Sequence, residues 1–160
     1  MDLKIKGKNA FITGGTRGLG LASLKSLASE GVNIAFCSRS EDGVNETTKH
    51  LSKLGVKYYG FVHEINSNDK NINELVAKLN NNFGDIDILV NNVGGSLGSS
   101  SLLDNDIETY MNVFNINFWA SVKLMKIYSE KMVTNGWGRI INIASIFGRE
   151  YGGKSSSYMS

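Results

Sequence analysis

The 160-residue sequence predicts an α/β fold of the doubly wound type, in which a parallel sheet is covered by helices on both faces. Two observations predict it. Apolar segments of strand length alternate along the chain with longer amphipathic segments, which is typical of repeated strand–helix units. The strand-like segments are apolar on both faces, as expected for the buried strands of a parallel sheet. No linker, low-complexity tail or longer repeat interrupts this pattern, so residues 1–160 are expected to form a single domain.

The first strand–helix unit lies near the N-terminus. Residues 9–13 form an apolar strand that ends in glycines, and residues 19–30 carry apolar side chains at helical spacing before Gly31 ends the helix. The same unit then repeats. Further strands are expected over residues 32–38, 57–63, 86–91 and 139–144, and further helices over residues 44–54, 70–83 and 106–133. The last helix is the longest and follows a Gly/Ser-rich loop over residues 94–101.

Composition and charge exclude several classes of function. The formal net charge is +2 and the basic residues are scattered, so no nucleic-acid partner is expected. The first residues alternate charged and apolar side chains, unlike a signal peptide, and the longest apolar runs have strand length. We therefore expect no membrane partner and a cytoplasmic location. The single cysteine, Cys37, lies in an apolar run and is expected to be buried, and no metal cluster is visible around His50 or His63.

A glycine-rich segment joins the first expected strand to the first expected helix, and it contains the pattern Gly-x-x-x-Gly-x-Gly. Glycines at such a turn let the backbone approach a pyrophosphate, and the helix N-terminus supplies N–H groups and the positive end of a dipole. A structural turn without a ligand is the alternative, because glycine-rich loops occur in many α/β domains. The residues of this segment expected to bind a dinucleotide are Gly14, Thr16, Arg17, Gly18, Leu19 and Gly20.

The end of the second expected strand indicates which dinucleotide is bound. Enzymes that use NAD(H) usually place a carboxylate there, which accepts a hydrogen bond from the ribose 2′-hydroxyl. In this chain the position reads Ser38-Arg39-Ser40, and a guanidinium pairs with a 2′-phosphate instead. Arg17 can add a second positive group, so NADP(H) is the expected cofactor, with Ser38 and Arg39 among its ligands. The alternative is that both arginines are solvated surface side chains.

Taken together, these features resemble the short-chain dehydrogenase/reductase family over essentially the whole chain, and the resemblance implies a Rossmann-type sheet. The glycine-rich segment is similar to the family's TGxxxGxG cofactor loop. Glu64 stands where the family commonly has an aspartate that contacts the adenine ring. The segment Asn91-Asn92-Val93-Gly94 resembles the family's NNAG motif, which lies along the cofactor, with Val93 in place of the usual alanine. The resemblance thus adds Glu64, Asn91, Val93 and Gly94 to the expected cofactor ligands.

Three further residues match catalytic positions of the family. Asn117, in the longest helix, resembles the catalytic asparagine, and Asn115 is its near rival. Ser145 matches the catalytic serine after the fifth strand, and Tyr158 follows it at the spacing of the family's YxxxK tyrosine. The resemblance implies that Tyr158 exchanges a proton with the substrate oxygen, that Ser145 donates a hydrogen bond to that oxygen, and that Asn117 fixes a water molecule.

A second tyrosine competes with Tyr158. Tyr151 and Lys154 are three residues apart rather than four, and Gly152-Gly153 between them favours a loop over the helix that would bring both side chains to one face. Tyr158 is therefore preferred. The lysine of the family motif would lie four residues past Tyr158, and the sequence ends two residues past it.

The resemblance implies an oxidoreductase that transfers a hydride between NADP(H) and a carbonyl or alcohol, similar to 3-oxoacyl-[acyl-carrier-protein] reductases. The substrate would be a small carbonyl or alcohol compound or an acyl thioester. Family members have about 250 residues, so residues 1–160 are expected to be incomplete at the C-terminus and inactive alone. The complete protein is expected to form a homodimer or homotetramer. A regulatory protein of the same fold, which senses NADP(H) without catalysis, is the alternative.

Overall fold

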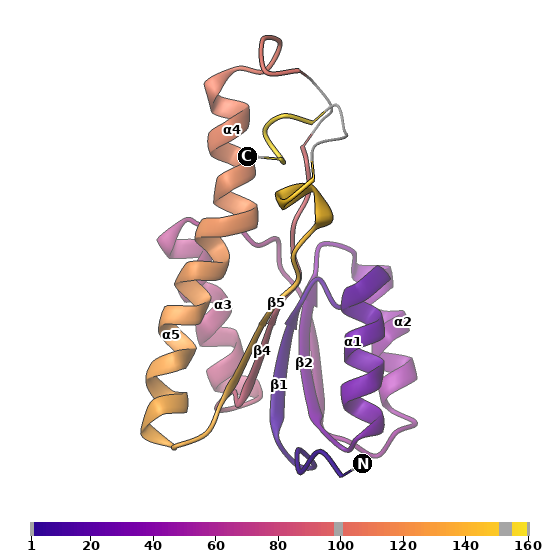
Figure 1. The fold of residues 1–160 in the computed structure, drawn as a ribbon. Helices are drawn as coiled ribbons and strands as arrows, with labels where there is room; N and C mark the ends of the chain where they lie inside the picture. Colours follow the sequence, from indigo (N-terminus) through magenta and orange to yellow (C-terminus); the bar gives the residue numbers. More distant parts are fainter. Residues whose placement is uncertain (1, 98–100, 151–154, 160) are drawn as a thin grey trace.

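The computed structural model describes residues 2–97, 101–150 and 155–159, and in these ranges the chain forms a five-stranded sheet with helices on both faces (Figure 1). All neighbouring strands are parallel, and their order is β3-β2-β1-β4-β5. The strands are β1 (Asn9–Thr13), β2 (Asn33–Ser38), β3 (Tyr58–Val62), β4 (Ile88–Asn91) and β5 (Arg139–Asn142). This arrangement confirms the doubly wound α/β fold.

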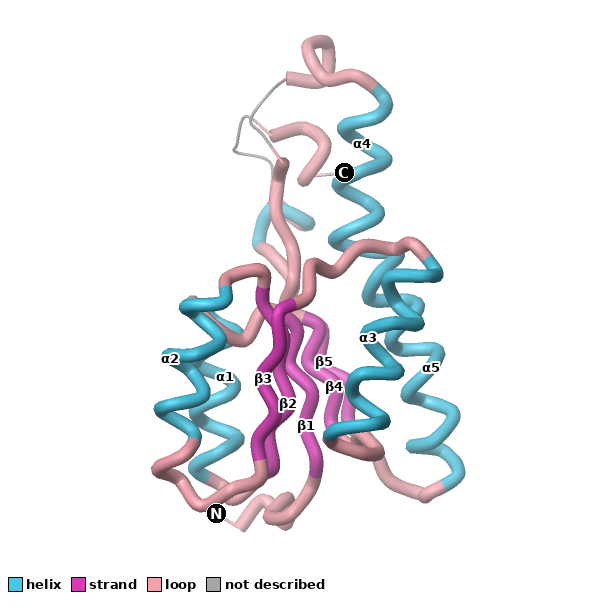
Figure 2. The backbone as a smooth tube through the Cα atoms, turned by 180° about the vertical axis from the view of Figure 1, so that it is seen from behind, coloured by secondary structure: helices cyan, strands magenta, loops and turns pink. Residues whose placement is uncertain are grey.

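The helices divide between the two faces of the sheet. They are α1 (Gly18–Ser29), α2 (Glu41–Leu51), α3 (Asp69–Asn82), α4 (Ile107–Phe114) and α5 (Ala120–Thr134). Figures 1 and 2 show α1 and α2 on one face and α3 and α5 on the other, while α4 extends beyond the carboxyl ends of the strands. The N-terminus lies at the opposite end of the sheet from α4.

The strands are apolar on both faces because each face of the sheet has its own hydrophobic core. Along β1, Phe11 packs into a cluster that contains Leu75 of α3 and Leu124 of α5. The next residue, Ile12, packs on the other face into a cluster that contains Leu24 of α1. All five side chains are buried, and burial of a side chain of this size contributes roughly 1.5–3 kcal/mol. Helices thus cover both faces of the sheet, and the carboxyl ends of its strands remain available for a binding site.

Helix α2 begins and ends three residues earlier than the predicted range of 44–54. Its start is set by Ser40, whose Oγ accepts a hydrogen bond from the backbone N–H of Gly43 at 3.1 Å. Glu41 and Asp42 in the first turn add negative charge at the positive end of the helix dipole. The apolar spacing alone did not locate this cap.

The long helix predicted over residues 106–133 is confirmed as a continuous helical segment, but a π-helical turn, Asn115–Trp119, interrupts its α-helical hydrogen bonding between α4 and α5. The backbone N–H of Ala120 donates to the carbonyl oxygen of Asn115, five residues earlier instead of four. One extra residue is accommodated in this turn, and such turns are frequent at functional sites. Strand β5 begins at Arg139, as predicted, and ends at Asn142, two residues before the predicted end at residue 144.

Candidate functional site

A cleft of about 670 Å³ opens at the carboxyl end of the sheet. The loops after β1 and β4 form its two sides. These strands are neighbours in the sheet, and the chain continues from them into helices on opposite faces of the sheet (Figure 1). Doubly wound proteins bind ligands at such a topological switch point. The predicted ligands that line the cleft are Gly14, Thr16, Arg17, Gly18, Ser38, Arg39, Glu64, Val93 and Gly94. Leu19, Gly20 and Asn91 are not among its lining residues.

The glycine-rich segment folds as a tight turn into α1. Gly14 and Gly18 have φ values of +69° and +54°, a conformation that favours glycine. Gly20 packs against the same turn, since a Cβ atom there would lie 2.3 Å from the carbonyl oxygen of Gly14. Arg17 precedes the helix in an extended conformation without a side-chain capping bond. The amides of the first helical turn, at the positive end of the dipole, therefore suit an anion.

Thr13 and Asn92 join the two sides of the cleft. Thr13 Oγ1 accepts hydrogen bonds from the backbone N–H of Asn92 at 2.8 Å and of Val93 at 3.0 Å. In return, Asn92 Nδ2 donates to the carbonyl oxygens of Thr13 at 2.9 Å and of Gly14 at 3.2 Å. Asn92 was not among the expected cofactor ligands, although it lies inside the segment Asn91-Asn92-Val93-Gly94 that resembles the family motif. These bonds fix the glycine-rich turn onto the end of β4.

The side chain of Asn91 is hydrogen-bonded within the sheet and does not line the cleft. It is buried, and its Nδ2 donates to Asn142 Oδ1 on β5 at 2.9 Å. Its Oδ1 is buried without a hydrogen-bond partner among the described residues. Asn91 therefore connects β4 to β5 and supports the carboxyl edge of the sheet.

The far end of the cleft is formed where β2 and β3 end. Thr16 Oγ1 lies 2.8 Å from Ser38 Oγ, so the glycine-rich turn is also hydrogen-bonded to β2. Arg39 Nη1 donates to Glu64 Oε1 at 3.3 Å, and both side chains remain about two-thirds exposed. Arg17 is exposed and lines the same cleft. Two guanidinium groups and one carboxylate thus surround this end.

Two buried groups line the cleft beneath these charges. Burial lowers the pKa of His63 below its ordinary value, and its Nε2 has no hydrogen-bond partner within the described part of the chain. Burial also raises the pKa of the Cys37 thiol to about 12, so the predicted buried cysteine is confirmed and its thiolate is not formed near neutral pH. In residues 2–97, 101–150 and 155–159 no group of His, Cys, Asp and Glu side chains is arranged to hold a metal ion.

The π-helical turn directs two asparagines to two different loops. Asn117 Oδ1 accepts from the backbone N–H of Gly95 at 2.8 Å, and its Nδ2 donates to the carbonyl oxygen of Gly95 at 2.9 Å. Asn115 Oδ1 instead accepts from Ser67 Oγ at 2.9 Å, in the loop before α3. Asn117 therefore holds the wall of the cleft, which Gly95 and Ile116 also line.

Ser145 and Tyr158 lie outside the lining of the cleft. Ser145 follows β5 and caps the short 3-10 turn Ile146–Gly148, accepting from the backbone N–H of Phe147 at 3.3 Å. Tyr158 is half-buried in a turn, not on a helix. Tyr151 and Lys154, the competing pair, lie outside the described residues.

The segment before Tyr158 is attached to α4. Ser156 Oγ accepts hydrogen bonds from Tyr110 Oη at 2.8 Å and from Asn105 Nδ2 at 3.0 Å. Ser157 is buried. These bonds join the segment before Tyr158 to α4 and to the loop that precedes it.

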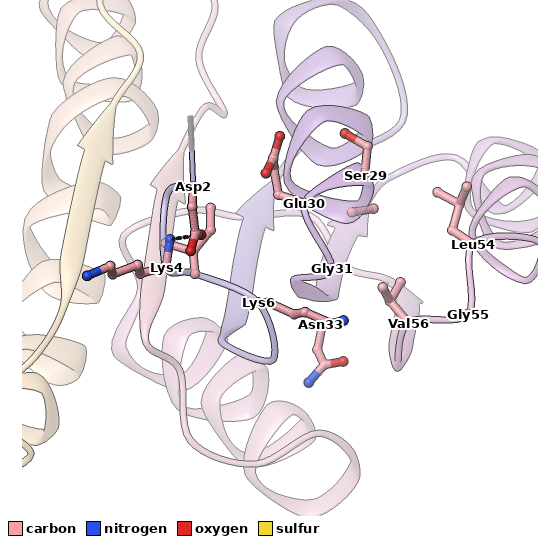
Figure 3. A pocket seen from close by; sticks show the side chains of 12 residues that line it. Asp2, Lys4, Lys6, Ser29, Glu30, Gly31, Asn33, Leu54, Gly55 and Val56 are labelled. Atoms are coloured by element: carbon pink, nitrogen blue, oxygen red, sulfur yellow. Dashed lines mark hydrogen bonds between the residues drawn. The ribbon is translucent and has the colours of Figure 1, made fainter.

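A second hollow, of about 530 Å³, lies at the amino end of the sheet (Figure 3). Its lining includes Lys4, Glu30 and Gly31, at the point where α1 ends. The carboxyl end of a helix presents carbonyl oxygens and the negative end of the dipole, so this hollow lacks the anion-binding features of the cleft. None of the helices in the described ranges combines the length and hydrophobicity that crossing a bilayer requires.

Comparisons with known proteins agree with this arrangement. Residues 8–160 match the family model described as short chain dehydrogenase. The chain is 32% identical over 152 residues to a 3-oxoacyl-[acyl-carrier-protein] reductase FabG of Aquifex aeolicus, a match that covers 92% of this chain and 59% of that protein. It is 29% identical over 146 residues to the ketoacyl reductase HetN of a Nostoc species, covering 91% of this chain and 50% of the relative. The chain thus spans about half to three-fifths of the length of these relatives.

Solved structures show the same fold. An L-sorbose reductase from Gluconobacter frateurii, complexed with NADPH and L-sorbose, superposes with a TM-score of 0.91 at 29% identity, covering 99% of this chain and 60% of the other. A 7α-hydroxysteroid dehydrogenase complexed with NADH and a 7-oxo bile acid gives 0.89 at 25% identity, with 99% and 61% covered. The family match, the sheet order and the cleft at the switch point together show that the chain belongs to the short-chain dehydrogenase family of oxidoreductases.

Proposed function

We propose that these residues form the cofactor half of an oxidoreductase that transfers a hydride between NADP(H) and a carbonyl or alcohol substrate. The observation that carries the proposal is the cleft at the switch point, which is lined by the glycine-rich turn with its Arg17 and by Arg39 directly after β2. The names of the ketoacyl reductase relatives favour an acyl-thioester carbonyl as the substrate. The chain covers only part of those relatives, so turnover is assigned to the whole protein.

The residues of the cleft fit a dinucleotide. A pyrophosphate is expected on the amides of the first turn of α1, with Leu19 contributing through its backbone, since its side chain is exposed. Gly20 acts by leaving space for the turn, since a side chain there would overlap Gly14. A 2′-phosphate is expected between Arg39 and Arg17, which suit its charge.

Other predicted ligands extend the proposed site along the cleft. Val93 and Gly94 line its opposite side, near the position expected for the nicotinamide end. Asn91 is proposed to act through the sheet, by connecting β4 to β5. Thr16 and Ser38 are hydrogen-bonded to each other, and their hydroxyls are suited to the phosphate and ribose oxygens nearby.

A bound nicotinamide would supply the hydride for carbonyl reduction or accept it in alcohol oxidation, and the protein would correspondingly donate or accept the proton. Tyr158 is assigned as the general acid or base, and Ser145 donates a hydrogen bond to the substrate oxygen as charge develops on it. An ordinary phenol ionises only near pH ~10, so proton transfer near neutrality needs a nearby cation. Asn117 is assigned to fix a water molecule, and its side chain is hydrogen-bonded to Gly95.

We also propose that the whole protein is cytoplasmic. It is proposed to self-associate as a homodimer or homotetramer through an exposed surface of this chain. The helical segment from α4 through the π-helical turn carries large exposed apolar side chains. They are Ile107, Met111, Phe114, Phe118 and Trp119, with exposed fractions between 38% and 74%. Apolar groups at helical spacing on one exposed segment are typical of a protein–protein contact.

The cofactor assignment is tested by titrating the protein with NADPH and with NADH, following cofactor fluorescence. NADPH is expected to bind more tightly, and Arg39→Ala is expected to weaken NADPH binding at least about ten-fold, because it removes a charge-assisted contact. Unchanged NADPH affinity in Arg39→Ala would contradict the assignment. For the whole protein, NADPH binding without reduction of any carbonyl substrate would instead support the sensing function.

A further inference from the structure

Arg39 and Glu64 form an ion pair at the mouth of the proposed cofactor cleft. β2 and β3 are parallel and in register, with Ser38 opposite Val62, so the residues that follow each strand emerge side by side. The guanidinium Nη1 lies 3.3 Å from the carboxylate Oε1. Arg39 and Glu64 both line the cleft. The group expected to receive a 2′-phosphate is therefore already paired with an anion of the protein.

The pair is exposed, which keeps it exchangeable. The side chains of Arg39 and Glu64 are 67% and 69% accessible. Exposed ion pairs contribute only about 0–1 kcal/mol, so a ligand anion can displace or share the guanidinium. Among the described residues that line the cleft, Arg17 and Arg39 are the permanent cations and Glu64 is the one carboxylate. The formal charge of that lining, +1 with Glu64 ionised, would become +2 without it.

We propose that Glu64 is a specificity-determining residue, whose carboxylate competes with the cofactor 2′-phosphate for Arg39 and so limits the preference for NADP(H) over NAD(H). The inference rests on the proposed function. A phosphate that binds Arg39 must either displace Glu64 or share the guanidinium with it, and both arrangements place two anions close together. NAD(H) carries a neutral 2′-hydroxyl, which can donate a hydrogen bond to the same carboxylate. Glu64 therefore disfavours one cofactor without disfavouring the other.

The decisive variant is Glu64→Gln, which keeps the size of the side chain and an acceptor oxygen but removes the charge. The strength of an exposed ion pair corresponds to at most about a five-fold change in affinity, and roughly a three-fold change is expected when the phosphate no longer competes with Glu64 for Arg39. Glu64→Gln is thus expected to tighten NADPH binding about three-fold while NADH binding is unchanged or weaker. The gain should shrink below about 1.5-fold near 1 M salt, because the Debye length there is only ~3 Å.

A matched control removes a carboxylate that lies far from the cleft, at the end of α1 opposite the glycine-rich turn. Glu30 lies at the C-terminal end of that helix, in the hollow shown in Figure 3. A helix of this length separates it from the cleft by roughly 18 Å, well beyond the Debye length at ordinary salt. Glu30→Gln changes the net charge equally, so it should leave the ratio of NADPH to NADH affinity unchanged.

The double variant Arg39→Ala/Glu64→Gln separates this inference from the cofactor assignment. If Glu64 acts through Arg39, the gain from Glu64→Gln should disappear in the Arg39→Ala background. A ratio that is unchanged or lowered in Glu64→Gln, or raised equally in both backgrounds, would overturn the inference. If Arg39→Ala alone leaves NADPH affinity unchanged, the proposed 2′-phosphate site fails instead.

Discussion

Gly20 offers the sharpest test of the cleft geometry. It lies in the first turn of α1, where replacement by alanine would ordinarily stabilise a helix by about 1 kcal/mol. In this chain the added Cβ would lie 2.3 Å from the carbonyl oxygen of Gly14 and 2.5 Å from Nδ2 of Asn92. Helix propensity and packing therefore predict opposite signs for Gly20→Ala.

The packing effect is the larger of the two. The obstructing atoms belong to the backbone of the turn and to an amide that is held by two hydrogen bonds, so no flexible side-chain end can move aside. Ordinary van der Waals contact requires the turn to move by roughly 1 Å, and overpacking of this kind costs about 1–3 kcal/mol. Loss of the two bonds donated by Asn92 adds about 1 kcal/mol each. After the gain in helix propensity, Gly20→Ala should lower the free energy of unfolding by about 3 kcal/mol.

Urea denaturation and thermal unfolding followed by circular dichroism would measure this change. For a chain of this size, about 3 kcal/mol corresponds to a decrease in Tm of roughly 6–12 °C, and NADPH binding should be lost. Gly95→Ala is the matched control for the unfolding measurement, since Gly95 has no positive φ and its Cβ would lie more than 4 Å from any atom of the described residues apart from its chain neighbours. A Gly20→Ala protein as stable as the wild type that still binds NADPH would refute the reasoning.

Two further changes test the supports of the same cleft. Thr13→Val removes the oxygen that accepts two backbone N–H groups of the segment after β4, so it should lower the free energy of unfolding by about 2–4 kcal/mol in urea denaturation; a loss below about 0.5 kcal/mol would contradict the clamp. Burial lowers the pKa of His63, so below pH ~6.5 the unfolded chain binds a proton that the folded chain rejects, and stability should fall as pH decreases. His63→Gln should flatten this loss between about pH 7 and pH 5, whereas His50→Gln, at an exposed position on α2, should retain it; an equal slope in all three proteins would exclude the explanation.

Most of the fold follows from the sequence because burial on two faces leaves a clear pattern. Each strand of the sheet was located within two residues, since runs such as Ala10–Ile12 are apolar throughout and end in polar or glycine residues. The predicted helix bounds and helix type differed from the structure where a local hydrogen bond determines them. The Ser40 cap moved the start of α2, although a serine followed by two acidic residues is a recognisable signal. The π-helical turn around Asn117 leaves no such signal, because Val113 and Ala120, the buried residues on its two sides, are still seven positions apart, as in an uninterrupted amphipathic helix.

The candidate site was predictable where it depends on residue type and less so where it depends on contact. Glycines at a strand–helix turn and an arginine after β2 can be recognised from sequence, since their chemistry is local. The pairing of Arg39 with Glu64 cannot be recognised from sequence, because it depends on the parallel register of β2 and β3. Asn92 was missed for a related reason. Its amide acts on the backbone of Thr13, which lies 79 positions earlier and becomes a neighbour only when β4 joins β1.

The two parts of the site differ in how they are held, and this difference has consequences for function. The cofactor cleft is fixed by hydrogen bonds between the ends of adjacent central strands, including those of Asn92 and Thr13, and by Asn117 on Gly95. Ser145 follows β5 and caps a short 3-10 turn, and the segment before Tyr158 is attached to α4 through Tyr110. Central strands packed on both faces open only with global unfolding, whereas loop segments beyond the sheet open locally at lower free energy. Cofactor binding should therefore tolerate disturbance near Tyr158, while alignment of the proposed proton donor should depend on the contacts that cover α4.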